Sequence, residues 1–223
     1  MMAYHAAVFD LDGTLLNTLA DLAASGNELL ESYGMTPHPQ QEYRYFVGNG
    51  SRKLMERIIP DASQERIDEA LLRYKKIYNR RLTEKTTPYD GILEMLSGLR
   101  NRGVRLAVCT NKHISAAEQL IRKYFPSDMF VAFDGDRPGI PRKPDPAHVR
   151  FVMEKMDVVP EETVYLGDSG VDMQTAINSG TLPVGVLWGF REKDDLLENG
   201  AKVLLSHPSE LFEKIDFSKK DEE

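Results

Sequence analysis

Hydrophobic and polar residues alternate along much of this chain in two recurring patterns. Short apolar or β-branched runs are separated by helix-length segments in which apolar residues recur every three or four positions. The runs that we interpret as strands are Ala6–Phe9, Val104–Cys109, Met129–Phe133, Thr163–Leu166, Pro183–Trp188 and Val203–Leu205. Helices are predicted between most of them, at Ile92–Arg102, Ile114–Tyr124, Ala147–Met156 and Val171–Ser179. Strands and helices in this order indicate an α/β fold, a Rossmann-like parallel sheet with helices on both faces.

Residues 16–87 follow a different pattern, which contains helical spacings and no clear strand. Leu19–Tyr33 carries apolar residues at helical spacing, and Ser51 and Ser63 are predicted to cap two further helices. An all-helical segment inserted after the first strand accounts for this pattern. We therefore assign residues 1–15 and 88–218 to an α/β core and residues 16–87 to a helical cap. No fixed structure is expected in the charged tail, residues 219–223.

Composition and charge narrow the classes of function. The chain has 223 residues, 41% of them hydrophobic, and no run long enough to span a membrane. We see no signal peptide, and a single cysteine, Cys109, excludes an internal disulfide, which together favour the cytoplasm. The net charge of −7 argues against nucleic acid or anionic membranes as partners. An anionic substrate therefore has to be attracted locally, by a metal ion and a few placed cations. Monomer and homodimer both stay open.

Polar residues follow several of the predicted strands. In parallel sheets, ligands bind beyond the carboxyl ends of the strands, so these residues are expected to share one edge. Asp10 and Asp12 follow the first strand, and like charges this close favour a cation or a proton between them. Thr110 ends a later run, at the predicted start of a helix where free N–H groups suit an anion. Later loops contribute Lys143 and the segment Gly167-Asp168-Ser169-Gly170-Val171-Asp172.

The order and spacing of these motifs resemble the haloacid dehalogenase superfamily of phosphohydrolases. The resemblance covers essentially the whole chain, and the Asp10–Thr14 motif combined with the later Gly-Asp-x-x-x-Asp motif is highly specific. Further strings are similar to the phosphoglycolate phosphatase branch: Val47-Gly48-Asn49-Gly50, Thr110-Asn111-Lys112, Lys143-Pro144-Asp145-Pro146 and Trp188-Gly189-Phe190. Asn17 departs from the pattern, in which aspartate is usual, but it lies outside the four motifs.

The resemblance implies a Mg²⁺-dependent phosphatase that hydrolyses small phosphate monoesters, with phosphoglycolate as the leading substrate. Asp10 would be the nucleophile that forms an aspartyl phosphate. Asp12 would protonate the leaving alcohol and then deprotonate the attacking water. Thr110 and Lys143 would bind the transferring phosphoryl group, helped by backbone N–H groups of Gly13 and Asn111.

The same resemblance implies a metal site and a substrate-closing cap. Mg²⁺ would be bound by Asp10, the backbone carbonyl of Asp12, and Asp168, with Asp172 holding metal-bound waters and Lys143. The helical insert would close over a small phosphorylated metabolite and exclude water. Its Gly48 and Gly50 would let the cap backbone approach the substrate. The candidate contacts there are Asn49, Ser51, Arg52 and Lys53, with Arg52 proposed for a substrate carboxylate.

Other functions stay open at this point. Within enzymes, the alternatives are a β-phosphoglucomutase-like phosphomutase and a pyrophosphatase. From another class, the chain would be a phosphate-binding regulator without turnover, which the retained Asp10 and Asp12 disfavour. A serine nucleophile elbow is excluded at Ser169, because position 171 is valine rather than glycine. The five histidines lack metal-ligand spacing, which disfavours zinc.

Overall fold

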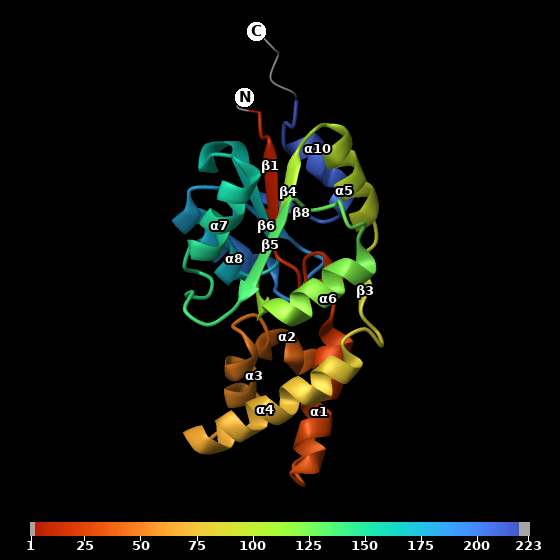
Figure 1. The fold of residues 1–223 in the computed structure, drawn as a ribbon, viewed down its shortest axis with the longest axis vertical. Helices are drawn as coiled ribbons and strands as arrows, with labels where there is room; N and C mark the ends of the chain where they lie inside the picture. Colours follow the sequence, from red (N-terminus) through yellow and green to blue (C-terminus); the bar gives the residue numbers. More distant parts are fainter. Residues whose placement is uncertain (1–2, 219–223) are drawn as a thin grey trace.

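A computed structural model describes residues 3–218, so the predicted tail at 219–223 lies outside the described residues. Strands form one parallel sheet in the order β5-β4-β1-β6-β7-β8 (Figure 1). At its centre, Val8 of β1 pairs with Ala107 of β4 and Tyr165 of β6. The strand bounds are β1 Ala6–Phe9, β4 Arg105–His113, β5 Ala132–Asp136, β6 Thr163–Gly167, β7 Leu182–Val186 and β8 Val203–Leu205.

Helices cover both faces of this sheet. Ala6 and Val8 of β1 pack in a cluster with α7 (Ala147–Met156) and α8 (Gly170–Ser179). Ala7 and Phe9 belong to the larger cluster that includes α5, α6 and α10. Because successive side chains of a strand point to opposite faces, this division confirms the predicted two-sided α/β fold. The remaining bounds are α5 Ile92–Asn101, α6 Ile114–Tyr124, α9 Lys193–Glu198 and α10 Leu211–Lys214.

Residues 16–87 place their helices beyond the carboxyl ends of the strands (Figure 1). These are α1 Leu19–Ser32, α2 Tyr43–Phe46, α3 Ser51–Ile58 and α4 Gln64–Arg81. The predicted cap of α4 is confirmed, because the Ser63 hydroxyl accepts a hydrogen bond from the Arg66 N–H. The predicted cap of α3 is wrong: Gly50 occupies the capping position and Ser51 is already helical. Short 3-10 helices lie at Gln40–Glu42, Pro160–Glu162 and Pro208–Glu210.

The two ends of the insert correct the expectation that it contains no strand. Strands β2 (Leu16–Asn17) and β3 (Thr87–Pro88) pair antiparallel, so the chain enters and leaves the insert side by side. The buried Asp21 carboxylate reinforces this junction by accepting the backbone N–H of Thr86 at 2.9 Å. In residues 3–218 we find no helix with the length and apolar character needed to cross a membrane.

Strand β4 also differs from its prediction. It continues to His113, beyond the predicted end at Cys109, whereas α6 begins at Ile114 as predicted, with His113 as its cap. Thr110 therefore lies within the strand rather than at a helix start, and the expected helical N–H groups are not adjacent to it. The strand continues because Lys112 and Asn111, although polar, find buried partners beyond the last apolar residue.

Candidate active site

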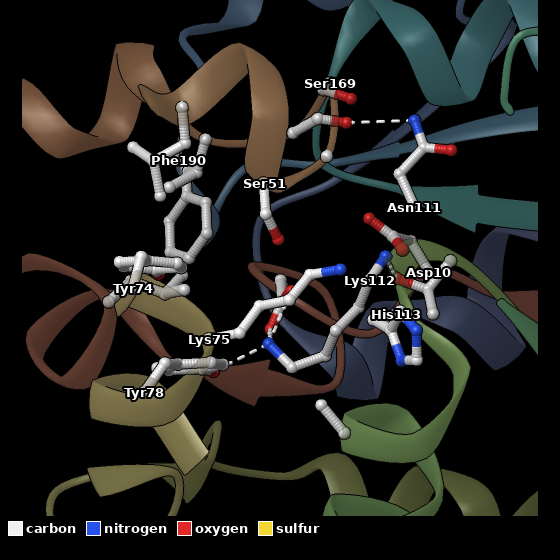
Figure 2. Close-up of a pocket in the computed structure, with 18 of the residues that line it drawn as sticks. Asp10, Ser51, Tyr74, Lys75, Tyr78, Asn111, Lys112, His113, Ser169 and Phe190 are labelled. Carbon is white, nitrogen blue, oxygen red and sulfur yellow. Dashed lines mark hydrogen bonds and ion pairs between the residues drawn. The ribbon is translucent and has the colours of Figure 1, made fainter. Parts of the chain in front are cut away.

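A pocket lies between the strand ends of the core and helices α3 and α4 of the insert (Figure 2). Its free volume is about 180 Å³, below the ~300–1,000 Å³ usual for ligand pockets, which favours a small ligand. Of the predicted site residues, those that line it are Asp10, Asp12, Gly48, Gly50, Ser51, Thr110, Asn111 and Asp168. Lys143, Asp172 and Gly13 contact this set without lining the pocket.

Asp10 sits directly after β1 with 8% of its surface exposed. Burial raises the pKa of its carboxyl to about 6, against the opposing effect of the nearby Lys143 ammonium. Lys143 Nζ forms an ion pair with Asp10 Oδ1 at 2.9 Å, and among residues 3–218 no group is assigned as a hydrogen-bond donor to this buried oxygen. Such an oxygen is free to attack an electrophile or to bind a cation.

Lys143 is a buried ammonium held between two carboxylates. Its Nζ lies 2.7 Å from Asp172 Oδ1 and also donates to the Cys109 carbonyl and the Tyr165 hydroxyl. Burial lowers the pKa of Lys143, but the charges of Asp10 and Asp172 outweigh burial and raise it overall. The ammonium therefore stays charged at neutral pH.

Asp10, Asp168 and Asp172 form the acidic cluster of this site, with one oxygen of each within 4.8 Å of the others. Asp172 has little capacity left, because Oδ1 accepts from Lys143 and Oδ2 accepts from both the N–H and the hydroxyl of Ser169. Asp168 Oδ2 accepts the Phe190 N–H at 2.7 Å, while in the part of the chain that the structure describes only the Thr14 hydroxyl, at 3.3 Å, donates to Oδ1. The oxygens free for a cation therefore belong to Asp10 and Asp168.

Burial foremost, and then the charges of Asp172 and Asp10, raise the pKa of Asp168 well above its usual value. A cluster of buried carboxylates whose pKa values are raised is costly to ionise without a counter-charge. Carboxylate oxygens are the ligands that hard cations such as Mg²⁺ prefer, so the residues present fit a divalent metal ion.

Asn111 and Thr110 line the pocket, and Gly13 packs against Asp168, which also lines it. Gly13 has a φ of +87°, and a Cβ there would lie 2.2 Å from Asp168 Oδ2, so only glycine fits. The Asn111 side chain accepts the Lys143 N–H and donates to the Gly48 carbonyl, which joins core and insert. The buried Thr110 hydroxyl accepts the Lys112 N–H at 3.3 Å.

Lys112 is a site residue to which the sequence analysis gave no role. Its Nζ donates to both oxygens of Asp12 at 2.9 Å and to the Tyr78 hydroxyl of α4 at 2.7 Å. The signal was present, since a lysine that directly continues an apolar strand needs a buried anionic partner. Lys112 therefore connects the predicted proton-transfer residue to the insert.

The predicted contacts in the insert divide into two groups. Ser51 lines the pocket together with Gly48 and Gly50. Arg52 instead pairs with Asp68 of α4, and Lys53 pairs with Glu56 at 2.6 Å on the helix surface. Asn49 accepts a hydrogen bond from Arg57, and neither Asn49 nor Arg52 lines the pocket. Nearby carboxylates within the insert thus pair with Arg52 and Lys53, the two cations that were predicted from the sequence to contact the substrate.

A family model for haloacid dehalogenase-like hydrolases matches residues 7–186, which is most of the chain. The chain belongs to this family of hydrolases. A curated phosphoglycolate phosphatase from Neisseria meningitidis is 32% identical, with 98% of this chain and 97% of the relative aligned. Another, from Agrobacterium fabrum, is 33% identical over 94% of this chain and 93% of the relative.

Solved structures agree with the family assignment. A crystal structure from Lactobacillus delbrueckii subsp. bulgaricus, provisionally described as a phosphoglycolate phosphatase, matches this haloacid dehalogenase-like hydrolase with a TM-score of 0.90. It is 32% identical and covers 96% of this chain and 99% of its own. The resemblance predicted from the motifs is therefore confirmed, and so is the α/β fold with its helical insert.

Proposed function

We propose that this hydrolase is a Mg²⁺-dependent phosphatase of small phosphate monoesters that acts through an aspartyl phosphate. The observation that carries the proposal is Asp10 Oδ1, a buried carboxylate oxygen at a pocket edge that lacks a hydrogen-bond donor within the described part of the chain. It lies 2.9 Å from a buried ammonium and close to a second carboxylate with spare coordination capacity. A nucleophile that must attack an anion needs this kind of neutralising surroundings.

In the first step, an oxygen of Asp10 attacks phosphorus and the bond to the leaving alcohol breaks. Asp12, two residues on and lining the same pocket, gives its proton to the leaving oxygen. In the second step, Asp12 takes a proton from a water molecule, which attacks phosphorus and releases inorganic phosphate. Asp10 is thereby regenerated, and Lys143 neutralises charge on the transferred group in both steps.

Asp10 and Asp168, with the backbone carbonyl of Asp12, would hold Mg²⁺. When bound, the ion supplies positive charge next to the phosphoryl oxygens and draws carboxylate and phosphate together. Asp172 would keep Lys143 in place, because both of its oxygens already accept hydrogen bonds from the core.

Phosphoglycolate is the leading substrate of the proposal. Two supports for it are the small pocket and the names of the curated relatives. A phosphomutase, a pyrophosphatase and a regulator without turnover are the alternatives, and no contact in the structure favours one of them. The proposed cellular setting is the cytoplasm, with the small phosphorylated metabolite as partner.

A turnover assay tests the proposal. Purified protein with Mg²⁺ should release phosphate from phosphoglycolate and from p-nitrophenyl phosphate. Activity should vanish with EDTA and return with Mg²⁺, and acid-quenched protein should carry phosphate on Asp10. Absence of turnover on every monoester would refute the phosphatase, and transfer only between sugar phosphates would identify a mutase.

A further inference from the structure

On the insert side of the pocket, Lys75 and Tyr74 each carry a polar group that has no protein partner among residues 3–218. Lys75 of α4 lines the pocket, and among residues 3–218 its ammonium has neither a hydrogen-bond nor an ion-pair partner. Figure 2 shows the Lys75 side chain reaching from α4 into the pocket. The hydroxyl of the preceding residue, Tyr74, is buried, and within the described part of the chain it lacks a hydrogen-bond partner. Both residues line the pocket, so a ligand bound there is the partner still available to these two groups.

Other cations of the insert behave differently. Six of them pair with carboxylates of the insert itself or bind carbonyl and amide oxygens: Arg52, Lys53, Arg57, Arg66, Arg80 and Arg81. The next residue, Lys76, is exposed and does not line the pocket. Lys75 thus differs from its neighbours in combining an orientation into the pocket with the lack of a counter-charge.

The surroundings of Lys75 strengthen an interaction with an anion. Leu22, Leu54 and Phe190 contribute buried apolar surface to the same pocket. Attraction between opposite charges grows as water is excluded, so an anion here would bind more tightly than at an exposed lysine. A buried polar group without a partner, such as the Tyr74 hydroxyl, regains a hydrogen bond when a ligand supplies the acceptor.

We propose that Lys75, assisted by the Tyr74 hydroxyl, binds a carboxylate on the leaving group of the substrate. This inference rests on the proposed function, which places the phosphoryl group at Asp10. The phosphoryl end already has Lys143 and the metal site, so Lys75 serves the opposite end of the molecule. The substrate class is a short phosphate monoester with a carboxylate near the ester oxygen. Lys75 takes the role that the sequence analysis gave to Arg52.

A carboxylate suits this subsite better than a second phosphate does. One ammonium and one hydroxyl match the hydrogen-bonding capacity of a carboxylate, whereas a phosphate dianion usually gathers more donors. The pocket volume of about 180 Å³ also favours the smaller group.

The experiment compares two isosteric substrates, 2-phosphoglycolate and its amide, which lacks the negative charge. The kcat/KM ratio of acid to amide is measured for the unmodified protein, for Lys75→Met and for Lys75→Arg. The matched control is Lys76→Met, which makes the same chemical change at the next position. We expect Lys75→Met to lower the ratio about 10- to 100-fold, the effect of a hydrogen bond to a charged group. Lys75→Arg should restore part of the ratio, and Lys76→Met should keep the ratio of the unmodified protein.

The possible outcomes separate this inference from the proposed function. If the unmodified protein hydrolyses neither compound nor any other monoester, the phosphatase proposal fails. If it hydrolyses both without preferring the acid, or if Lys75→Met lowers both values equally, the subsite is refuted and the phosphatase stands. A preference for a bisphosphate substrate that Lys75→Met abolishes would also overturn the carboxylate assignment.

Discussion

The core side and the insert side of the pocket satisfy their polar groups in opposite ways. On the core side, the Lys143 ammonium is shared between Asp10 and Asp172, and the Lys112 ammonium binds both oxygens of Asp12. On the insert side, the Lys75 ammonium and the Tyr74 hydroxyl, among the described residues, have no protein partner. The core side is therefore assembled before substrate arrives. On our proposal, the substrate supplies the missing partners on the insert side.

We interpret this difference as a division of roles: the core side holds the groups for the reaction, and the insert side holds the groups that select the substrate. Charges that must hold a nucleophile in place are fixed by mutual contacts, because free side chains would have to be ordered during each turnover. Charges that select a substrate are left unsatisfied, because a group already paired with the protein would gain little from a ligand. Changes on the core side should therefore alter turnover and stability, and changes on the insert side should alter substrate preference.

The largest effect is expected at the nucleophile. Asp10→Asn removes the attacking oxygen and one metal ligand, so turnover should fall by about 10⁴-fold or more. Steady-state phosphate release measures this loss, and circular dichroism checks that the fold is kept. Asp194→Asn on the exposed surface of α9 is the control and should retain activity. Near-normal rates in Asp10→Asn would contradict the assembly of the core side around this carboxylate.

The second test compares the two core lysines. Lys143→Met leaves Asp10 and Asp172 buried without their cation, which should lower the free energy of unfolding by about 3–5 kcal/mol. Lys112→Met should cost less, because the Asp12 side chain is 19% exposed and water can solvate it. Urea denaturation of the metal-free variants measures both. Equal losses of stability in the two variants would contradict the expectation that the more deeply buried ion pairs of Lys143 contribute more than the pair of Lys112 with Asp12.

The core side could be predicted from the sequence because its chemistry follows strand ends. Each carboxylate or cation comes directly after an apolar run or in the loop that follows one, and parallel strands bring these ends to one edge. Asp10, Thr110 and Asp168 were found in this way, and the structure places all three in one pocket. The boundary of β4 was missed, because Asn111 and Lys112 are polar residues that stay in the strand through tertiary contacts.

The insert side could not be predicted in the same detail. The spacing of apolar residues predicts which face of each insert helix is buried. Which polar residue faces the pocket, however, depends on how α3 and α4 pack against each other and against the core. Arg52 and Lys75 are both cations on amphipathic helices, and only the fold shows that Arg52 forms an ion pair with Asp68. Ser51, Gly48 and Gly50 could be predicted because the glycines mark the loop before α3. Tyr74 and Tyr78 lie at helical spacing with apolar residues, so the sequence predicts them only as core residues.

The third test concerns the acidic cluster and pH. The pKa of Asp10 in the folded protein, about 6, lies above its usual value of 3.8, so the folded state binds more protons between these pH values. The contribution of Asp10 to the stability of the metal-free protein should therefore fall as pH rises from about 4 to 6, and it is read as the difference in stability between the unmodified protein and Asp10→Asn. Mg²⁺ competes with these protons, so its stabilisation should be larger at pH 7.5 than at pH 5.

Thermal unfolding with and without Mg²⁺ measures this dependence. At a free Mg²⁺ concentration of about 100 times its Kd, the expected gain at pH 7.5 is about 3 kcal/mol. At pH 5 about nine-tenths of Asp10 carries a proton, so the gain should be smaller by about 1 kcal/mol. Asp10→Asn should lose most of the gain at both pH values. A gain that is independent of pH would place the ion away from Asp10.

The smallest effect comes from two tyrosines of one helix that stack on each other at 5.7 Å between ring centroids. The Tyr78 hydroxyl accepts a hydrogen bond from the core Lys112, whereas the Tyr74 hydroxyl, within residues 3–218, has no partner. Tyr78→Phe should therefore destabilise the substrate-free protein by about 1.5–3 kcal/mol, the range of a hydrogen bond to a charged group. Tyr74→Phe removes a buried hydroxyl that is already unsatisfied, so stability should stay within about 0.5 kcal/mol or rise. Because both changes delete one hydroxyl from the same stacked pair, urea denaturation compares them directly. A larger loss in Tyr74→Phe than in Tyr78→Phe would reverse the assignment of satisfied and unsatisfied groups on which the comparison of the two sides depends.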